Sequence, residues 1–87
     1  MKKVTAKWLC ERDACWEHII LFSIFFPFGA KPTLKNIEKA EKLGLDTEWL
    51  AVSMPTQFWV DYRLKHDGPL HLVRNNMIIA WLEQLEE

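Results

Sequence analysis

The sequence predicts a mostly or entirely α-helical protein, a compact small bundle of five to six short helices in a single domain over residues 1–87. Three observations support this class. The 87 residues are 49% hydrophobic and 26% charged, a balance typical of folded globular chains. Helix-capping residues precede several runs in which an apolar residue recurs at every third or fourth position. Proline and glycine divide these runs into short pieces.

Two helices are expected at the N-terminal end. Thr5 is a suitable N-cap for a helix that runs to about Arg12. Asp13 is a suitable N-cap for a second helix over residues 14–26, which Pro27 must end because proline cannot continue a helix.

Two more helices are expected in the middle of the chain. Thr33 is a suitable N-cap for the run that follows it, and Gly44 stands at the position where a helix commonly stops. Asp46 can cap a short helix over residues 47–54, which ends ahead of Pro55.

The segment 57–74 permits two interpretations. Apolar and polar residues alternate over 58–64 as in a half-buried strand, and Asp67-Gly68 is a suitable turn for a β-hairpin. Thr56, however, is a suitable N-cap, and aromatic residues in this segment also pair at helical spacing. We favour the helix and keep the hairpin as the alternative.

A final helix is expected from Leu70 to Glu87. Apolar residues recur there every three to four positions with polar residues between them, which is the pattern of an amphipathic helix.

Residues 18–28 form a strongly apolar stretch in which His18 and Ser23 are the polar members. A helix over this stretch is apolar nearly all round, and such a helix is normally enclosed by other elements. A domain of this size has few elements with which to enclose it. Two interpretations stay open: the stretch is the central helix of the bundle, or one of its faces binds a partner.

The net charge, the length of the apolar stretch and the cysteine content limit the kinds of partner and the cellular location that we expect. Eleven Lys and Arg against 12 Asp and Glu give a net charge of −1, so no overall basic field draws the chain to nucleic acid or anionic lipid. The stretch 18–28 is about half the ~20 residues of a membrane-spanning helix, and acids precede it where a signal peptide has basic residues. Cys10 and Cys15 fit a reduced compartment better than a disulfide scaffold. We expect a cytoplasmic protein that does not enter a membrane.

The residues with metal-binding or nucleophilic chemistry are few. A structural zinc site needs four ligands, and the chain offers no second cysteine pair to complete one. No glycine-rich loop or nucleophile elbow marks an oxyanion pocket. We therefore expect no enzymatic activity, no catalytic residues, no metal and no cofactor. The residues considered for these roles are Cys10, Cys15, His18, His66 and His71.

Residues 37–53 allow an alternative function, that of a small helix-turn-helix-like DNA-associated regulator. Ala40 precedes Gly44 by four residues, and small residues at this spacing let two helices cross closely. Asp46 and Glu48 oppose this function because they place negative charge where phosphates would approach. The sequence therefore favours a protein partner over nucleic acid. The nucleic-acid contacts expected under this alternative are Lys31, Lys35, Lys39 and Lys42.

Aromatic residues supply the remaining signal, because five tryptophans are heavy usage for 87 residues. Packing in the core accounts for many aromatic side chains, but a core of this size cannot easily hide them all. Trp and Tyr are also favoured at the centres of protein interfaces. We therefore expect a protein partner, either another protein or a second copy in a homodimer. The expected partner-binding residues are Trp16, Leu21, Phe25, Phe28 and Trp59.

A pattern of short motifs runs through residues 14–51. Its parts are Ala14-Cys15, then Phe26-Pro27-x-Gly29, then a helix capped by Thr33, and finally Asp46-x-x-Trp49-Leu50-Ala51. This segment resembles one found in small proteins of bacteriophages and bacterial mobile elements. In those proteins the helix after Ala-Cys usually carries more polar residues than EHIILFSIFF does here. The resemblance implies a helical fold and a phage context, and it implies no activity.

The sequence thus predicts a small, non-enzymatic protein-interaction module of phage or mobile-element type in the host cytoplasm. The resemblance alone suggests its target, a host factor such as a defence nuclease complex that the protein would inhibit.

Overall fold

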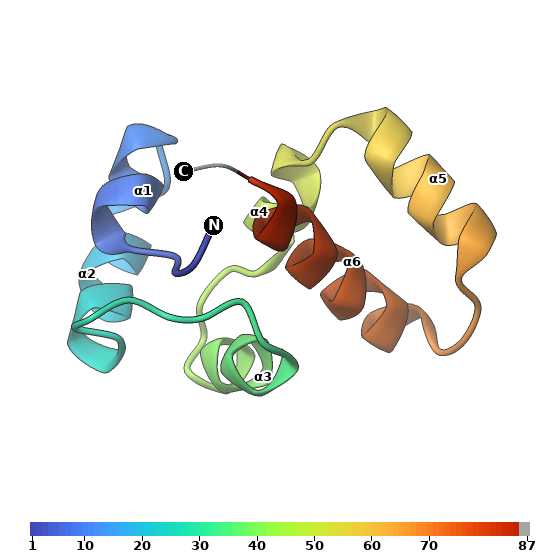
Figure 1. The fold of residues 1–87 in the computed structure, drawn as a ribbon. Helices are drawn as coiled ribbons and strands as arrows, with labels where there is room; N and C mark the ends of the chain where they lie inside the picture. The colour runs from blue at the N-terminus through green and yellow to red at the C-terminus, as the bar shows by residue number, and fades with distance from the viewer. Residues whose placement is uncertain (86–87) are drawn as a thin grey trace.

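The computed structural model describes residues 1–85, and these form six α-helices (Figure 1). Within these residues the extended pairing is limited to one antiparallel bridge between Val4 and Ala30. The expected helical bundle is therefore confirmed, and the hairpin alternative for 57–74 is wrong. The helices are α1 (Ala6–Glu11), α2 (Trp16–Phe25), α3 (Leu34–Lys42), α4 (Glu48–Ser53), α5 (Thr56–Lys65) and α6 (Leu70–Gln84).

The central helix of the bundle is α6. It packs against α3, α4 and α5, and Ile78 at its middle is fully buried (Figure 1). By contrast, α2 lies at one side of the molecule and packs mainly against α1. The interpretation of residues 18–28 as the central helix is therefore wrong. The expected final helix ends at Gln84, and positions 86 and 87 of that prediction lie outside the described residues.

Two of the expected N-terminal caps, Thr5 and Thr33, are present. The hydroxyl oxygen of Thr5 accepts a hydrogen bond from the N–H of Trp8 at the start of α1. Thr33 makes the same contact at the start of α3, where its hydroxyl accepts from the N–H of Asn36. The N-cap of α4 is Thr47 rather than the expected Asp46, although the carboxylate of Asp46 still accepts a hydrogen bond from the N–H of Trp49 in the first turn. Each contact satisfies a backbone donor that the first turn of a helix leaves unpaired.

Gly44 ends α3 as expected. Its φ of 84° is left-handed, and the two amides that follow the helix turn back to its last carbonyls. The N–H of Gly44 donates to Glu41, and the N–H of Leu45 donates to Ala40. This is the Schellman arrangement, in which glycine adopts the left-handed conformation without a steric cost.

The prediction that Asp13 starts the second helix at Ala14 is wrong. Asp13 instead ends α1, with a left-handed φ of 58° and an N–H that donates to Cys10. Asp is among the few non-glycine residues that adopt this conformation readily, because its short polar side chain hydrogen-bonds locally. The next helix therefore begins later, at Trp16. Thr56 is likewise the first residue of α5 rather than its N-cap, which is Pro55.

The helices α1 and α2 form an antiparallel pair, here called the α1–α2 hairpin. The bridge between Val4 and Ala30 closes its open end through two backbone hydrogen bonds of 2.8 Å. Gly29 next to this bridge has a φ of 84°, so the chain turns there through a conformation that favours glycine.

A cluster of three tryptophans joins the hairpin to the rest of the bundle. The ring of Trp8 in α1 lies 6.4 Å from the ring of Trp49 in α4 and 6.4 Å from that of Trp81 in α6, both edge to face. The guanidinium of Arg12 lies 4.9 Å from the centre of the Trp8 ring. Aromatic pairs of this geometry add stability beyond the area that they bury.

Candidate functional site

The two sides of α2 have different environments. Because an α-helix turns about 100° per residue, Trp16, Ile20 and Ile24 fall on one arc of its surface. All three are exposed, and Trp16 and Ile24 expose 67% and 64% of their surface. On the opposite arc Phe22 is buried and Ile19 is half-buried against the core. The helix is therefore apolar on both sides but covered on only one.

Two further exposed apolar side chains lie at the end of α2 and in the loop after it. Phe28 is 83% exposed, and Phe25 at the end of the helix is exposed to a smaller degree. From residue 19 to residue 30 the chain carries no charged side chain. We call this surface the outer face of α2. Its members are Trp16, Ile20, Ile24, Phe25 and Phe28.

The sequence-based list of partner-binding residues overlaps this surface without matching it. Trp16, Phe25 and Phe28 belong to the outer face of α2, whereas Leu21 is half-buried at its border. Trp59 is exposed but lies on α5, at the other side of the molecule from α2 (Figure 1). The structure therefore does not bring these five residues together.

A second set of exposed apolar side chains lies on the α5 and α6 pair. Charged residues interrupt it, because Asp61, Arg63 and Lys65 are exposed on the same short helix. Its members are Trp59, Val60, Leu64, Leu70 and Leu72.

The lysines of the DNA-binding alternative are all exposed on or before α3. The ammonium group of Lys39 lies 4.9 Å from the centre of the Phe26 ring, a cation–π contact within the protein. The helix that would enter the major groove, α4, has six residues, and Glu48 at its start pairs with Arg74. This geometry gives the alternative no support beyond the exposed charges of Lys31, Lys35, Lys39 and Lys42.

The histidines considered as ligands each have a partner within the fold. Nδ1 of His18 accepts a hydrogen bond of 3.0 Å from the backbone N–H of Asp46. The ring of His66 stacks on that of Tyr62 at 3.9 Å, and His71 pairs with a carboxylate of α3. Cys10 and Cys15 are exposed and form no disulfide. Among residues 1–85, no three His, Cys, Asp or Glu side chains are placed to hold a metal ion.

A polar network connects α3, α4 and α6, and sequence reasoning missed it. At its centre is Asn75, which is 1% exposed. Its Nδ2 donates to Oε1 of Glu41 at 2.7 Å, and its Oδ1 accepts from Nη2 of Arg74 at 2.9 Å. Arg74 also donates to Glu48 at 2.5 Å and to Thr47 at 3.0 Å. Charge-assisted hydrogen bonds of this kind fix how three helices sit together.

No sequence signal marked this network, because each member also fits the solvated face of an amphipathic helix. Its role is structural, since every polar side chain in it already has a hydrogen-bond partner within the network.

Within residues 1–85, no helix combines the length and apolar character needed to cross a bilayer. Comparison of the chain with protein-family models, curated proteins and solved structures finds no match.

Proposed function

We propose that this chain is a small, non-enzymatic protein-interaction module that binds a partner protein through the outer face of α2. The observation that carries the proposal is the exposed, uncharged stripe of Trp16, Ile20 and Ile24 on one arc of a short helix. Monomeric proteins rarely expose a contiguous apolar surface unless it serves binding. Tryptophan is enriched among the residues that dominate interface energies.

The outer face of α2 suits this role better than the apolar residues of α5. It has no charged residue after Glu17, whereas acidic and basic side chains divide the apolar residues of α5. An interface core depends on a patch from which water and charge are excluded. A short amphipathic partner segment, or the groove of a larger protein, fits such a surface.

The class of partner follows from the resemblance of residues 14–51 to phage and mobile-element proteins. We propose a bacterial host protein in the cytoplasm, with inhibition of a host defence complex as the specific form of this function. The apolar outer face is the feature in which this chain departs from the more polar helix of the proteins that it resembles, so it is where we place the specificity.

Site-specific photo-crosslinking tests this function. A photoreactive residue at position 24 should capture a discrete host protein during expression in bacteria. The same residue at position 38 serves as the control, because Glu38 is exposed on α3 and lies away from the outer face. Capture at position 38 alone, or equal capture at both positions, would contradict the proposed surface.

A matched pair of substitutions separates binding from folding. Ile24→Glu should keep the cooperative thermal unfolding of the wild type, because Ile24 is exposed. It should also abolish capture of the host protein by a photoreactive residue placed at position 16 of the same face. Phe22→Glu should unfold the protein, since it buries an unpaired carboxylate in the core. If calorimetry shows that Ile24→Glu is also unfolded, the outer face is core and the proposal fails. Light scattering on the same samples measures the molar mass. A dimer of the wild type that Ile24→Glu converts to a monomer would show that the partner is a second copy of the chain.

A further inference from the structure

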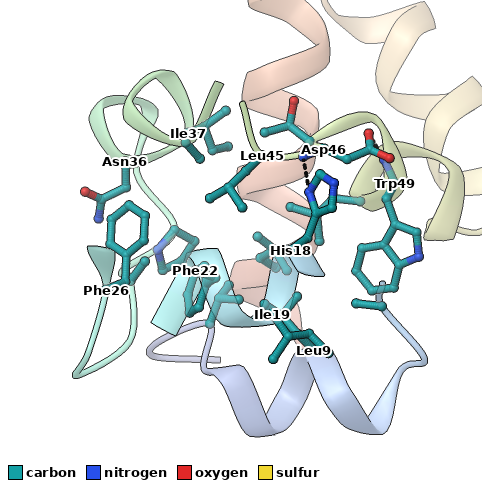
Figure 2. Close-up of a pocket in the computed structure, with 18 of the residues that line it drawn as sticks. Leu9, His18, Ile19, Phe22, Phe26, Asn36, Ile37, Leu45, Asp46 and Trp49 are labelled. Carbon is teal, nitrogen blue, oxygen red and sulfur yellow. Dashed lines mark hydrogen bonds between the residues drawn. The ribbon is translucent and has the colours of Figure 1, made fainter. Parts of the chain in front are cut away.

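An apolar cavity lies between the inner side of α2 and the segments that form α3 and α4. Its volume is about 130 Å³. Figure 2 shows side chains from both sides converging on it: Ile19 and Phe22 come from α2, and Ile37, Leu45 and Trp49 come from the opposite wall. The wall is therefore built from elements far apart in the sequence, and it is formed mainly by carbon atoms.

The cavity exists because small side chains occupy part of its wall. Ala14, Ala30 and Ala40 contribute only methyl groups there. Protein interiors normally have few voids larger than a water molecule. A void of this size between bulky neighbours forgoes dispersion contacts that a ligand would restore.

Several polar groups around the cavity already have partners. The ring of His18 and the backbone of Asp46 are joined across one edge by their hydrogen bond (Figure 2). Nδ2 of Asn36 donates to the backbone oxygen of Lys31 at 2.9 Å, and the hydroxyl of Thr47 accepts from Arg74. In the described part of the chain, no buried side-chain nitrogen or oxygen lacks a hydrogen-bond partner. A bound water needs two to four polar partners, so the interior of this cavity holds water poorly.

The cavity reaches the surface. Cys15, Lys31 and Asp46 line it, and all three are exposed. A ligand can therefore enter beside these residues without unfolding of the core.

We propose that this cavity binds a small, uncharged, apolar molecule about the size of one aromatic ring. The volume supports this class, because an engineered cavity of about 150 Å³ in another protein, lined by Leu, Ile and Phe, stays dry and binds benzene. A charged ligand would have to lose its hydration without gaining a free polar partner inside. The site is independent of the proposed partner surface, because Phe22, which lines the cavity, and the exposed Ile20 lie about 200° apart around α2.

Benzene is the probe that tests this site. Titration into methyl-labelled protein should give saturable shifts and intermolecular nuclear Overhauser effects at Ile19, Ile37 and Leu45. The adjacent residue Ile20 and the exposed Ile24 serve as internal controls and should show neither effect. Contacts to Ile20 and Ile24 instead, or shifts that do not saturate, would overturn the proposal.

A cavity-filling variant sharpens the test. Ala40→Leu projects a larger side chain from α3 into the cavity and should weaken benzene binding at least tenfold. Glu38→Leu places the same side chain on the exposed surface of α3 and should leave binding unchanged. A folded Ala40→Leu protein that binds benzene as well as the wild type would refute the site. If Ala40→Leu does not fold, the wild-type contacts to Ile19 against those to Ile20 decide the question.

Discussion

Two helices rich in apolar residues, α6 and α2, are buried to different extents. The longer one, α6, packs against three other helices, and its side chains Ile78 and Leu82 are almost fully buried. The shorter one, α2, meets the core through one side, leaves a cavity beneath that side and exposes large side chains on the other. The difference shows that the number of neighbouring elements, rather than the apolar content of a helix, determines how far it is buried.

The largest expected effect comes from the same truncation made in both helices. Ile78→Ala should lower the free energy of unfolding by about 4 kcal/mol, since it opens a new void in a closely packed centre. Ile19→Ala should cost only about 1 to 2 kcal/mol, because Ile19 is half-buried beside an existing cavity. Urea denaturation measures both. Equal costs would show that α2 packs as tightly as α6.

Removal of the buried amide of α6 should have the next largest effect. Asn75→Ala leaves Glu41 and Arg74 without their shared partner, and we expect a loss of about 3 kcal/mol. Asn76→Ala is the matched control at the next, half-buried position and should stay within about 1 kcal/mol of the wild type. Equal denaturation midpoints for the two variants would mean that the polar network between α3, α4 and α6 contributes little.

The smallest expected change in stability comes from replacing two glycines that share the same backbone conformation. Gly29 and Gly44 both have a φ of 84°. An added Cβ at Gly29 would lie 2.9 Å from the carbonyl oxygen of Val4, while nothing lies within 4 Å of one at Gly44. We expect Gly44→Ala to cost about 1 kcal/mol and Gly29→Ala about 2 kcal/mol.

Hydrogen exchange locates the damage from these glycine variants. Gly29→Ala should speed the exchange of the Val4 and Ala30 amides, which form the bridge of the α1–α2 hairpin. Gly44→Ala should leave both amides unchanged. Faster exchange at the bridge in both variants would show that the hairpin and α3 open together.

Short-range sequence signals were sufficient to predict where several of the helices begin and end. A cap such as Thr33 or a stop such as Gly44 acts through hydrogen bonds within a few residues, so its effect can be inferred from neighbours in the chain. Asp13 shows where this reasoning fails. The same residue type can start one helix or end another, and only the left-handed turn at the end of α1 decided between them.

The surfaces of α2 could not be predicted in the same way. A helix that is apolar all round carries no periodic signal to show which side faces the core. Leu21 was therefore expected on the open face, while the exposed Ile20 and Ile24 were not. The role of Asn75 was equally hidden, because its partner Glu41 is 34 positions away in the sequence. Both features depend on tertiary packing.

The cluster of Trp8, Trp49 and Trp81 gives the molecule its own optical signal. Trp8 belongs to the α1–α2 hairpin, while the other two indoles belong to the remainder of the bundle. Near-ultraviolet circular dichroism requires aromatic rings in fixed relative positions, whereas the far-ultraviolet signal persists as long as the helices do. If the α1–α2 hairpin separates from α6, the near-ultraviolet signal should weaken while the far-ultraviolet signal stays unchanged. The packing of the hairpin against the bundle can therefore be followed in unlabelled protein.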